Sequence, residues 1–122
     1  MKTILVVEDE FAIADMLSAV LQDEGYHVVL ASNGREGLLR LADTEIHADL
    51  VLCDVMMPVL DGREMRKTMK GDPALKDIPI VLMSAAEESS ASNNGIAGPF
   101  LSKPFELETL LKIIEEQIGK PD

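Results

Sequence analysis

The sequence is poor in cysteine, in long apolar runs and in basic residues, and each scarcity excludes a class of protein. Its single cysteine, Cys53, cannot form an internal disulfide, and no charged-then-apolar leader precedes the first apolar run, so we expect a reduced, cytoplasmic setting. No apolar stretch approaches the roughly 18 residues that a membrane-spanning helix needs. Eleven Lys and Arg residues stand against 22 Asp and Glu residues, and the formal net charge of −11 disfavours direct binding to nucleic acid or to a membrane surface. We therefore expect protein partners.

Length and composition indicate one folded domain. At 122 residues the chain lies within the roughly 100–200 residues of a single domain and is long enough to bury a core. Hydrophobic residues make up 47% of the chain and charged residues 27%, a balance typical of a globular protein rather than of a disordered or fibrous one. We therefore expect residues 1–122 to form a single domain.

Short apolar runs alternate along the chain with segments of helical periodicity. The apolar run Thr3–Val7 is followed by a segment from Phe11 to Glu24, in which apolar residues recur every three or four positions before Gly25. The alternation continues along the chain and predicts five strands, each followed by a helix. The further strands expected are 26–31, 49–54, 78–84 and 99–102, and the further strongly periodic helices are 34–42, 62–70 (with Met65 and Met69 facing inward) and 107–118.

The strand-like runs indicate a parallel sheet. Segments 50–53 and 80–83 are apolar at every position, which is typical of strands buried on both faces. We therefore predict an α/β fold, a doubly wound five-stranded parallel sheet with helices on both faces. The segment 85–98, where a fourth helix is expected, is rich in Ser, Asn and Gly and nearly lacks an apolar stripe, so we predict a short or frayed helix there.

Polar side chains stand where the expected strands end. Glu8 and Asp9 follow the first strand, Asp54 ends the third, Ser84 ends the fourth, and Lys103 follows the fifth. Because ligands of such sheets bind beyond the carboxyl ends of the strands, we expect these groups to converge there. Three carboxylates repel one another unless protons or a hard divalent cation relieve the repulsion, and carboxylates with water suit Mg²⁺ best. The pattern therefore predicts a Mg²⁺-assisted phosphoryl site.

Four segments, taken in order, resemble the signature sequences of receiver domains of bacterial two-component response regulators, of the chemotaxis type. They are the acidic pair within 7–10, the aspartate-bearing strand and loop 49–62, the strand end 79–85, and the Phe-Leu-Ser-Lys-Pro-Phe segment 100–105. The resemblance runs the full length of the chain. It implies the flavodoxin-like strand order 2-1-3-4-5 and a signalling domain that catalyses its own phosphoryl transfer and dephosphorylation, rather than an enzyme acting on a separate substrate.

The same resemblance assigns a phosphoacceptor and a metal site. Asp54 would be the phosphorylated aspartate, and Mg²⁺ would be bound by Glu8, Asp9, Asp54 and the backbone carbonyl of Met56. The phosphoryl group would come from a sensor histidine kinase or from a histidine phosphotransfer protein of a phosphorelay. The output would act on a downstream protein target or on a fused output domain.

The resemblance also assigns residues that respond to the phosphoryl group. Ser84 and Lys103 would hold it, Ser84 and Phe100 would form the switch, and the peptide between Lys103 and Pro104 matches the cis peptide of the family. Two features depart from the family pattern. The helix expected over 85–98 is poor in helix formers, and Phe100 stands where Tyr is frequent, so it reports the state only by the burial of its ring.

Other classes of protein fit the same residues less well. A flavodoxin-type nucleotide binder needs a Ser-, Thr- or Gly-rich loop after the first strand, where this chain has the acidic residues 8–10. A phosphatase with an aspartyl nucleophile needs an acid two residues after Asp54, where Met56 stands. The alternative is a receiver-like docking module that acts without phosphorylation. We expect Asp61 to form a turn or a helix cap, and Met56 and Met57 to be packing residues.

Overall fold

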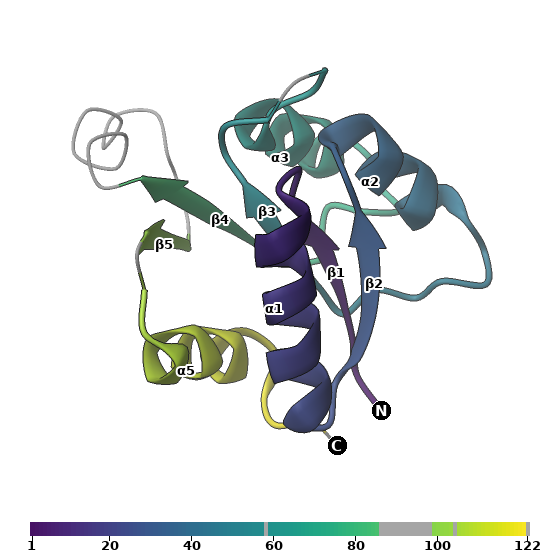
Figure 1. Cartoon of the computed structure of the whole chain (residues 1–122). Helices are drawn as coiled ribbons and strands as arrows, with labels where there is room; N and C mark the ends of the chain where they lie inside the picture. The colour runs from purple at the N-terminus through teal and green to yellow at the C-terminus, as the bar shows by residue number, and fades with distance from the viewer. Residues whose placement is uncertain (58, 86–98, 104, 122) are drawn as a thin grey trace.

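The computed structural model describes residues 1–57, 59–85, 99–103 and 105–121, and it confirms the predicted doubly wound fold (Figure 1). All strand pairs are parallel, in the order β2-β1-β3-β4-β5. The strands are β1 (Thr3–Val7), β2 (His27–Ala31), β3 (Leu50–Asp54), β4 (Ile80–Ala85) and β5 (Phe100–Lys103), and the helices are α1 (Phe11–Asp23), α2 (Gly34–Ala42), α3 (Gly62–Lys70) and α5 (Leu107–Ile118).

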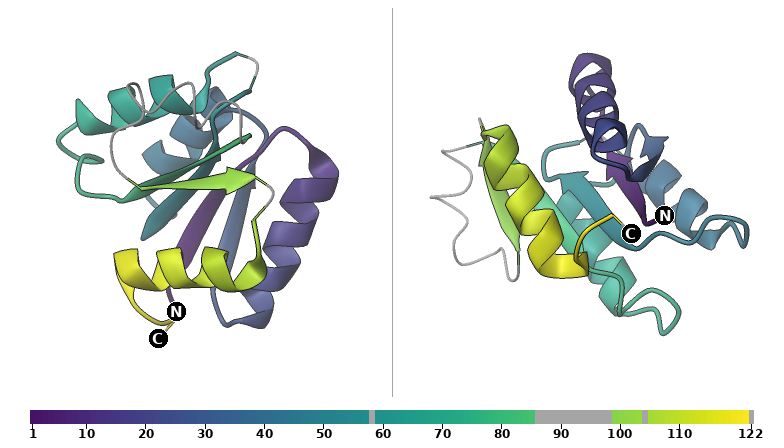
Figure 2. Two further views of the ribbon diagram at one scale, coloured as in Figure 1. Left: turned by 90° about the vertical axis from the view of Figure 1, so that its left-hand side faces the viewer. Right: turned by 90° about the horizontal axis from the view of Figure 1, so that it is seen from below.

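Alternate residues of the strands face two separate cores. On one face, Ile4 of β1 packs in a cluster with Leu17 of α1 and Ile114 of α5. On the other face, the neighbouring Leu5 belongs to a cluster that includes Met65 of α3. Figure 2 shows α3 and α5 on opposite sides of the sheet. Because helices cover both faces, the segments 50–53 of β3 and 80–83 of β4 are apolar at every position, as expected for a parallel sheet.

Side chains ahead of two helices determine where those helices begin. The Asn33 side chain accepts a hydrogen bond from the Glu36 N–H at 2.8 Å and caps α2. Asp61 caps α3, because its side chain accepts from the Glu64 N–H at 3.0 Å while the Glu64 carboxylate accepts from the Asp61 N–H at 3.2 Å. The prediction that Asp61 has a local structural role is therefore confirmed.

Several element boundaries differ from the prediction by one or two residues. Tyr26 does not belong to β2, because its N–H donates to the Leu21 carbonyl at 3.0 Å and so closes the end of α1. β5 includes Lys103, which lies in register with Ala85, the last residue of β4. The short or frayed helix was predicted over 85–98, but its first residue, Ala85, belongs to β4. Residues 86–98 lie outside the described ranges.

The two chain ends lie side by side at the end of the sheet where β1 begins (Figures 1 and 2). The Lys2 N–H donates to the Pro121 carbonyl at 3.1 Å, and the Tyr26 hydroxyl donates to the Gly119 carbonyl at 3.2 Å. These contacts tie the end of α5 to β1 and to the start of β2, away from the polar strand ends. Within the described part of the chain, no helix has the length and apolar character needed to cross a membrane.

Candidate functional site

Two buried carboxylates lie side by side where β1 and β3 end. The register of these strands brings Glu8, directly after β1, next to Asp54, the last residue of β3. Only 2% of Glu8 and 6% of Asp54 is exposed, whereas Asp9 lies on the surface. Glu8 is held by its own loop, since its Oε2 accepts a hydrogen bond from the Glu10 N–H at 3.2 Å. Burial of two adjacent acids is costly unless a cation is near.

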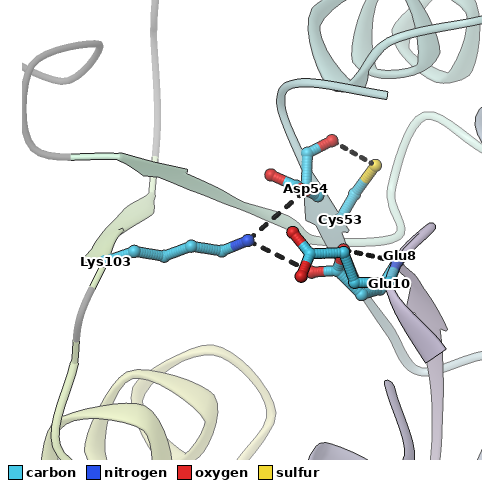
Figure 3. A network of polar contacts seen from close by, with 5 residues as sticks. All are labelled: Glu8, Glu10, Cys53, Asp54 and Lys103. Carbon is cyan, nitrogen blue, oxygen red and sulfur yellow. Dashed lines mark hydrogen bonds and ion pairs between the residues drawn. The ribbon is translucent and has the colours of Figure 1, made fainter. Parts of the chain in front are cut away.

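Lys103 supplies that positive charge from β5. Its Nζ lies 3.2 Å from Glu8 Oε1 and 3.3 Å from Asp54 Oδ2. Figure 3 shows the side chain extended from β5 toward both carboxylates, which it reaches from the far side of β4. One ammonium group therefore faces two carboxylates, and the arrangement keeps an excess of negative charge. Such a site favours a second cation.

The three predicted acids fit a divalent metal ion. Glu8, Asp9 and Asp54 each offer a carboxylate oxygen, and these oxygens lie within 4.8 Å of one another. An all-oxygen set with an exposed member, Asp9, leaves room for water ligands, which Mg²⁺ retains in most protein sites. The donor chemistry therefore suits Mg²⁺ rather than a metal that prefers nitrogen or sulfur.

The pKa values of Glu8 and Lys103 reflect this mixture of burial and charge. Burial, aided by the nearby Asp54 charge, raises the pKa of Glu8 from 4.5 to about 7, although the Glu10 N–H and Lys103 both favour its ionised form. Burial alone would lower the pKa of Lys103, but the Asp54 and Glu8 carboxylates outweigh it and raise that pKa above its usual value. Lys103 is therefore charged at neutral pH, and Glu8 is close to half ionised.

Ser84 lies on the same edge of the sheet. Asp54 is in register with Met83 of β4, so Ser84 is one residue further toward the carboxyl ends. It is fully buried, and its Oγ has no hydrogen-bond partner among the residues that the structure describes. A buried hydroxyl without a partner is costly, so an acceptor within its reach would be favoured.

Other predicted residues have different surroundings. Met56 is 61% exposed, so the expectation that it packs in the core is wrong, whereas Met57 is buried as expected. The loop after β3 directs the two side chains to opposite environments. Phe100 is half-buried and packs against the cluster on the α2 and α3 side of the sheet. Pro104 lies outside the described residues, and so does the predicted cis peptide.

Gly62 is a positioning residue that the sequence interpretation missed. It opens α3, its N–H donates to the Val55 carbonyl at 3.0 Å, and a Cβ at this position would lie 2.6 Å from the backbone oxygen of Asp54. Only glycine lets the start of α3 approach the end of β3 so closely. The Asp61-Gly62 pair was visible in the sequence, but it indicated only a cap or turn, because the close approach involves residues brought together by folding.

A family model and two solved structures match nearly the whole chain. The model for the response regulator receiver domain matches residues 4–115. The receiver domain of a signal transduction histidine kinase from Syntrophus aciditrophicus has a TM-score of 0.87 and 30% identity, covering 98% of this chain and 91% of that one. The receiver domain of sensor histidine kinase PA1611 from Pseudomonas aeruginosa, solved with a magnesium ion in its active site cleft, has a TM-score of 0.81 and 26% identity, covering 98% of both chains.

Curated relatives are longer than this chain. The phosphate regulon transcriptional regulatory protein PhoB of Pseudomonas aeruginosa is 33% identical, over 99% of this chain and 55% of its own length. The DNA-binding dual master transcriptional regulator RpaA of Synechocystis is 29% identical, over 100% of this chain and 51% of its own length. The chain thus spans about half the length of these relatives. The family match, the sheet order and the acidic strand ends agree, and the chain belongs to the receiver domains of two-component response regulators, which are signalling domains rather than conventional enzymes.

Proposed function

We propose that this receiver domain accepts a phosphoryl group on Asp54 from a phosphohistidine of a sensor histidine kinase or of a histidine phosphotransfer protein. The observation that carries the proposal is the position of Asp54, a buried carboxylate at the end of β3 with Lys103 Nζ at 3.3 Å and two further acids beside it. Burial of a carboxylate at such a position costs folding free energy, because its charge must be compensated, and a function of Asp54 would explain why this cost is retained.

In the proposed reaction, an Asp54 carboxylate oxygen attacks phosphorus while the bond between phosphorus and the partner's imidazole nitrogen breaks. The nitrogen keeps the electron pair of the broken bond and takes up a proton, and Asp54 becomes an acyl phosphate. Lys103 already points at Asp54 and can stay paired with a phosphoryl oxygen on it. The Ser84 hydroxyl can donate to another oxygen, which would give its Oγ a partner.

Mg²⁺ is the proposed cofactor, bound by Glu8, Asp9, Asp54 and the backbone carbonyl of Met56. When bound, it neutralises charge on the acids and on the phosphoryl oxygens. The oxygens within 4.8 Å of one another support the three carboxylate ligands. The magnesium ion in the PA1611 receiver supports the choice of metal by similarity. Because Lys103 pairs with Glu8 and Asp54, metal binding has to share these carboxylates with an ammonium already present.

The proposed output is conformational. Phosphorylation would draw the Ser84 hydroxyl toward Asp54, and Phe100, in register with Leu82 on the adjacent strand, would follow by changing the burial of its ring. The half-buried state of Phe100 leaves room for change in either direction. The recipient is a downstream protein target or a fused output domain.

The test is Mg²⁺-dependent labelling by a small acyl phosphate or phosphoramidate, followed by mass spectrometry of peptides. We expect one phosphoryl group on Asp54 and complete loss of labelling in Asp54→Asn. The control is Asp15→Asn, which changes an exposed aspartate of α1, has the same net charge as Asp54→Asn, and should be labelled normally. Equal labelling of Asp54→Asn and the parent would refute the phosphoacceptor assignment. Absence of labelling in a folded parent with Mg²⁺ would favour the alternative, a docking module that acts without phosphorylation.

We propose that residues 1–122 form one receiver domain and act in the cytoplasm, in keeping with the one cysteine, Cys53, being a buried free thiol. The chemotaxis subclass gains no support from the curated relatives, which are mostly transcriptional regulators. The expectation that nucleic acid is no partner conflicts with a relative that is named as DNA-binding.

A further inference from the structure

Helix α3 presents a basic surface on a strongly acidic chain. It contains four of the 11 Lys and Arg residues but only one of the 22 Asp and Glu residues, so its formal charge is +3 while the remainder of the chain carries −14. Figures 1 and 2 show α3 on the opposite side of the sheet from α5. Apart from Gly62, which lets the start of α3 approach the end of β3, no residue of the proposed phosphoryl site lies on this helix. The concentration of positive charge is therefore a separate feature of the molecule.

The cations of α3 form one stripe. Arg63, Arg66, Lys67 and Lys70 are spaced i, i+3, i+4 and i+7, which places them together on one face of a helix. Met65 and Met69 are fully buried and hold a different face against the sheet. Thr68, which lines the groove between α3 and α2, lies on the side of the helix away from the cations. The four cations, called here the basic stripe, face away from α2.

The basic stripe is not explained by the stability of its own helix. Like charges three or four residues apart repel, and Arg63 lies in the first turn, where the helix dipole favours acids. Lys67 and Lys70 lie in the last turn, where the dipole favours cations, and Lys70 Nζ donates to the Lys76 carbonyl at 3.2 Å, so the favourable and unfavourable contributions oppose each other. None of the four cations forms an ion pair with any residue that the structure describes. Arg63, Lys67 and Lys70 are exposed, whereas Arg66 is half-buried. Negative charge on a partner would relieve the repulsion among the exposed cations.

We propose that the basic stripe is a docking surface for an acidic segment of a protein partner. Charge complementarity identifies the partner's chemistry, and a short segment fits the stripe, which is about 10 Å long at 1.5 Å per residue. The buried methionines and the Asp61–Glu64 capping box fix α3, so little order has to be gained on binding. A long polyanion such as duplex DNA, or a second copy of this chain, would instead meet the repulsion of the remaining −14 charge.

The probe is an alanine-based helical peptide of about 16 residues with four glutamates at the spacing of the stripe, together with the same peptide carrying lysines. Binding to the full chain is followed by amide chemical shifts and calorimetry at low ionic strength. The test variant is Arg63→Gln/Lys67→Gln/Lys70→Gln, which removes like-charge repulsion. We expect it to fold with a melting temperature close to that of the parent, because it also removes the favourable interactions of Lys67 and Lys70 with the end of the helix.

A matched control separates the stripe from overall charge. Arg35→Gln/Lys112→Gln/Lys120→Gln neutralises three exposed cations elsewhere, so both variants change the net charge from −11 to −14. We expect the glutamate peptide to shift amides of α3, to bind the stripe variant at least about tenfold more weakly, and to bind the control within about twofold of the parent. The affinity should fall as salt rises, and the lysine peptide should not bind at α3.

Four outcomes would overturn the proposal. The first is an equal loss of affinity for the glutamate peptide in the stripe variant and the control, and the second is peptide-induced chemical-shift changes confined to residues outside α3. The third is a duplex DNA of equal charge that binds the stripe more tightly than the peptide does. The fourth is self-association of the parent that is lost in the stripe variant. Each result would assign the charge of α3 to another cause or to another kind of partner.

Discussion

Replacement of Glu8 by glutamine tests whether burial governs the acidic site. In the unfolded chain Glu8 titrates near 4.5, whereas burial raises its pKa to about 7 in the folded protein. Between these values the folded state binds more protons than the unfolded state, so the stability falls as pH rises. The stabilisation associated with the Glu8 proton is therefore fully present below pH 4.5 and is lost as pH passes about 7.

The size of the effect follows from the pKa difference. A shift from 4.5 to about 7 corresponds to about 3 kcal/mol of unfolding free energy at about 1.4 kcal/mol per pKa unit. Because only 2% of Glu8 is exposed, little of this is lost to solvent screening. A glutamine side chain cannot ionise, so Glu8→Gln lacks this loss of stability.

Urea unfolding between about pH 5 and pH 8, with a chelator present, measures the difference. We expect the stability of the parent to fall by up to about 3 kcal/mol more than that of Glu8→Gln over this range. The control is Glu10→Gln, because that side chain is exposed and only its backbone N–H contacts Glu8. It should have the pH dependence of the parent. Excess Mg²⁺ should reduce the dependence in the parent, since the metal binds only the ionised acid.

The same slope for the parent and Glu8→Gln would refute the reasoning, because no buried proton on Glu8 would then be lost between these pH values. A steep slope shared by Glu8→Gln and Glu10→Gln would place the titration on another group. Either result would remove the basis for treating Glu8 as an acid that needs a metal or an ammonium ion to ionise.

Three further predictions concern neighbouring residues. Gly62→Ala should destabilise the fold by about 1–3 kcal/mol in chemical unfolding, because the new Cβ meets the Asp54 backbone oxygen, whereas Gly71→Ala, with nothing nearer than 3.5 Å, should be close to neutral. Equal effects of the two changes would contradict the close approach. Mg²⁺ should raise the melting temperature of the parent, because a hundredfold excess over Kd stabilises the folded state by about 2.7 kcal/mol. The increase should be smaller in Asp9→Asn, and a melting temperature that does not respond to Mg²⁺ would rule out the metal site. Lys103→Ala should still be labelled on Asp54 but show smaller phosphorylation-induced chemical-shift changes, and changes equal to those of the parent would exclude Lys103 from the response.

Local patterns in the sequence were sufficient to predict, within one or two residues, the strands and helices that lie in the described ranges. Continuous apolar runs such as 50–53 indicate strands covered on both faces, and the three- and four-residue spacing of apolar residues indicates the helices packed on them. The polar strand ends also followed from the sequence, since parallel strands place their carboxyl ends on one edge. The boundaries were less certain, because hydrogen bonds such as that of the Tyr26 N–H to Leu21 decide them.

Met56 and Met57 show where local patterns fail. Both are methionines in the same loop, and composition predicts packing for each, yet one is exposed and the other buried. The path of the loop after β3 decides which side chain reaches the core. The surroundings of Phe100 are likewise set by the register of β4 and β5, which pairs it with Leu82, rather than by any feature of its neighbours in sequence.

The sequence by itself determined the fold class, the family and the set of acids, hydroxyl and lysine that the strands would bring to one edge. The fold class depends on residue type and periodicity, which are local properties of the chain, and the family depends on the four motifs that resemble receiver-domain signatures. Only the tertiary structure decided that Lys103 reaches both Glu8 and Asp54, that Ser84 is buried without a partner in the described part of the chain, and that Gly62 must lack a side chain. These depend on distances of a few ångströms between segments far apart in sequence. Such distances are settled only when both cores are packed against the sheet.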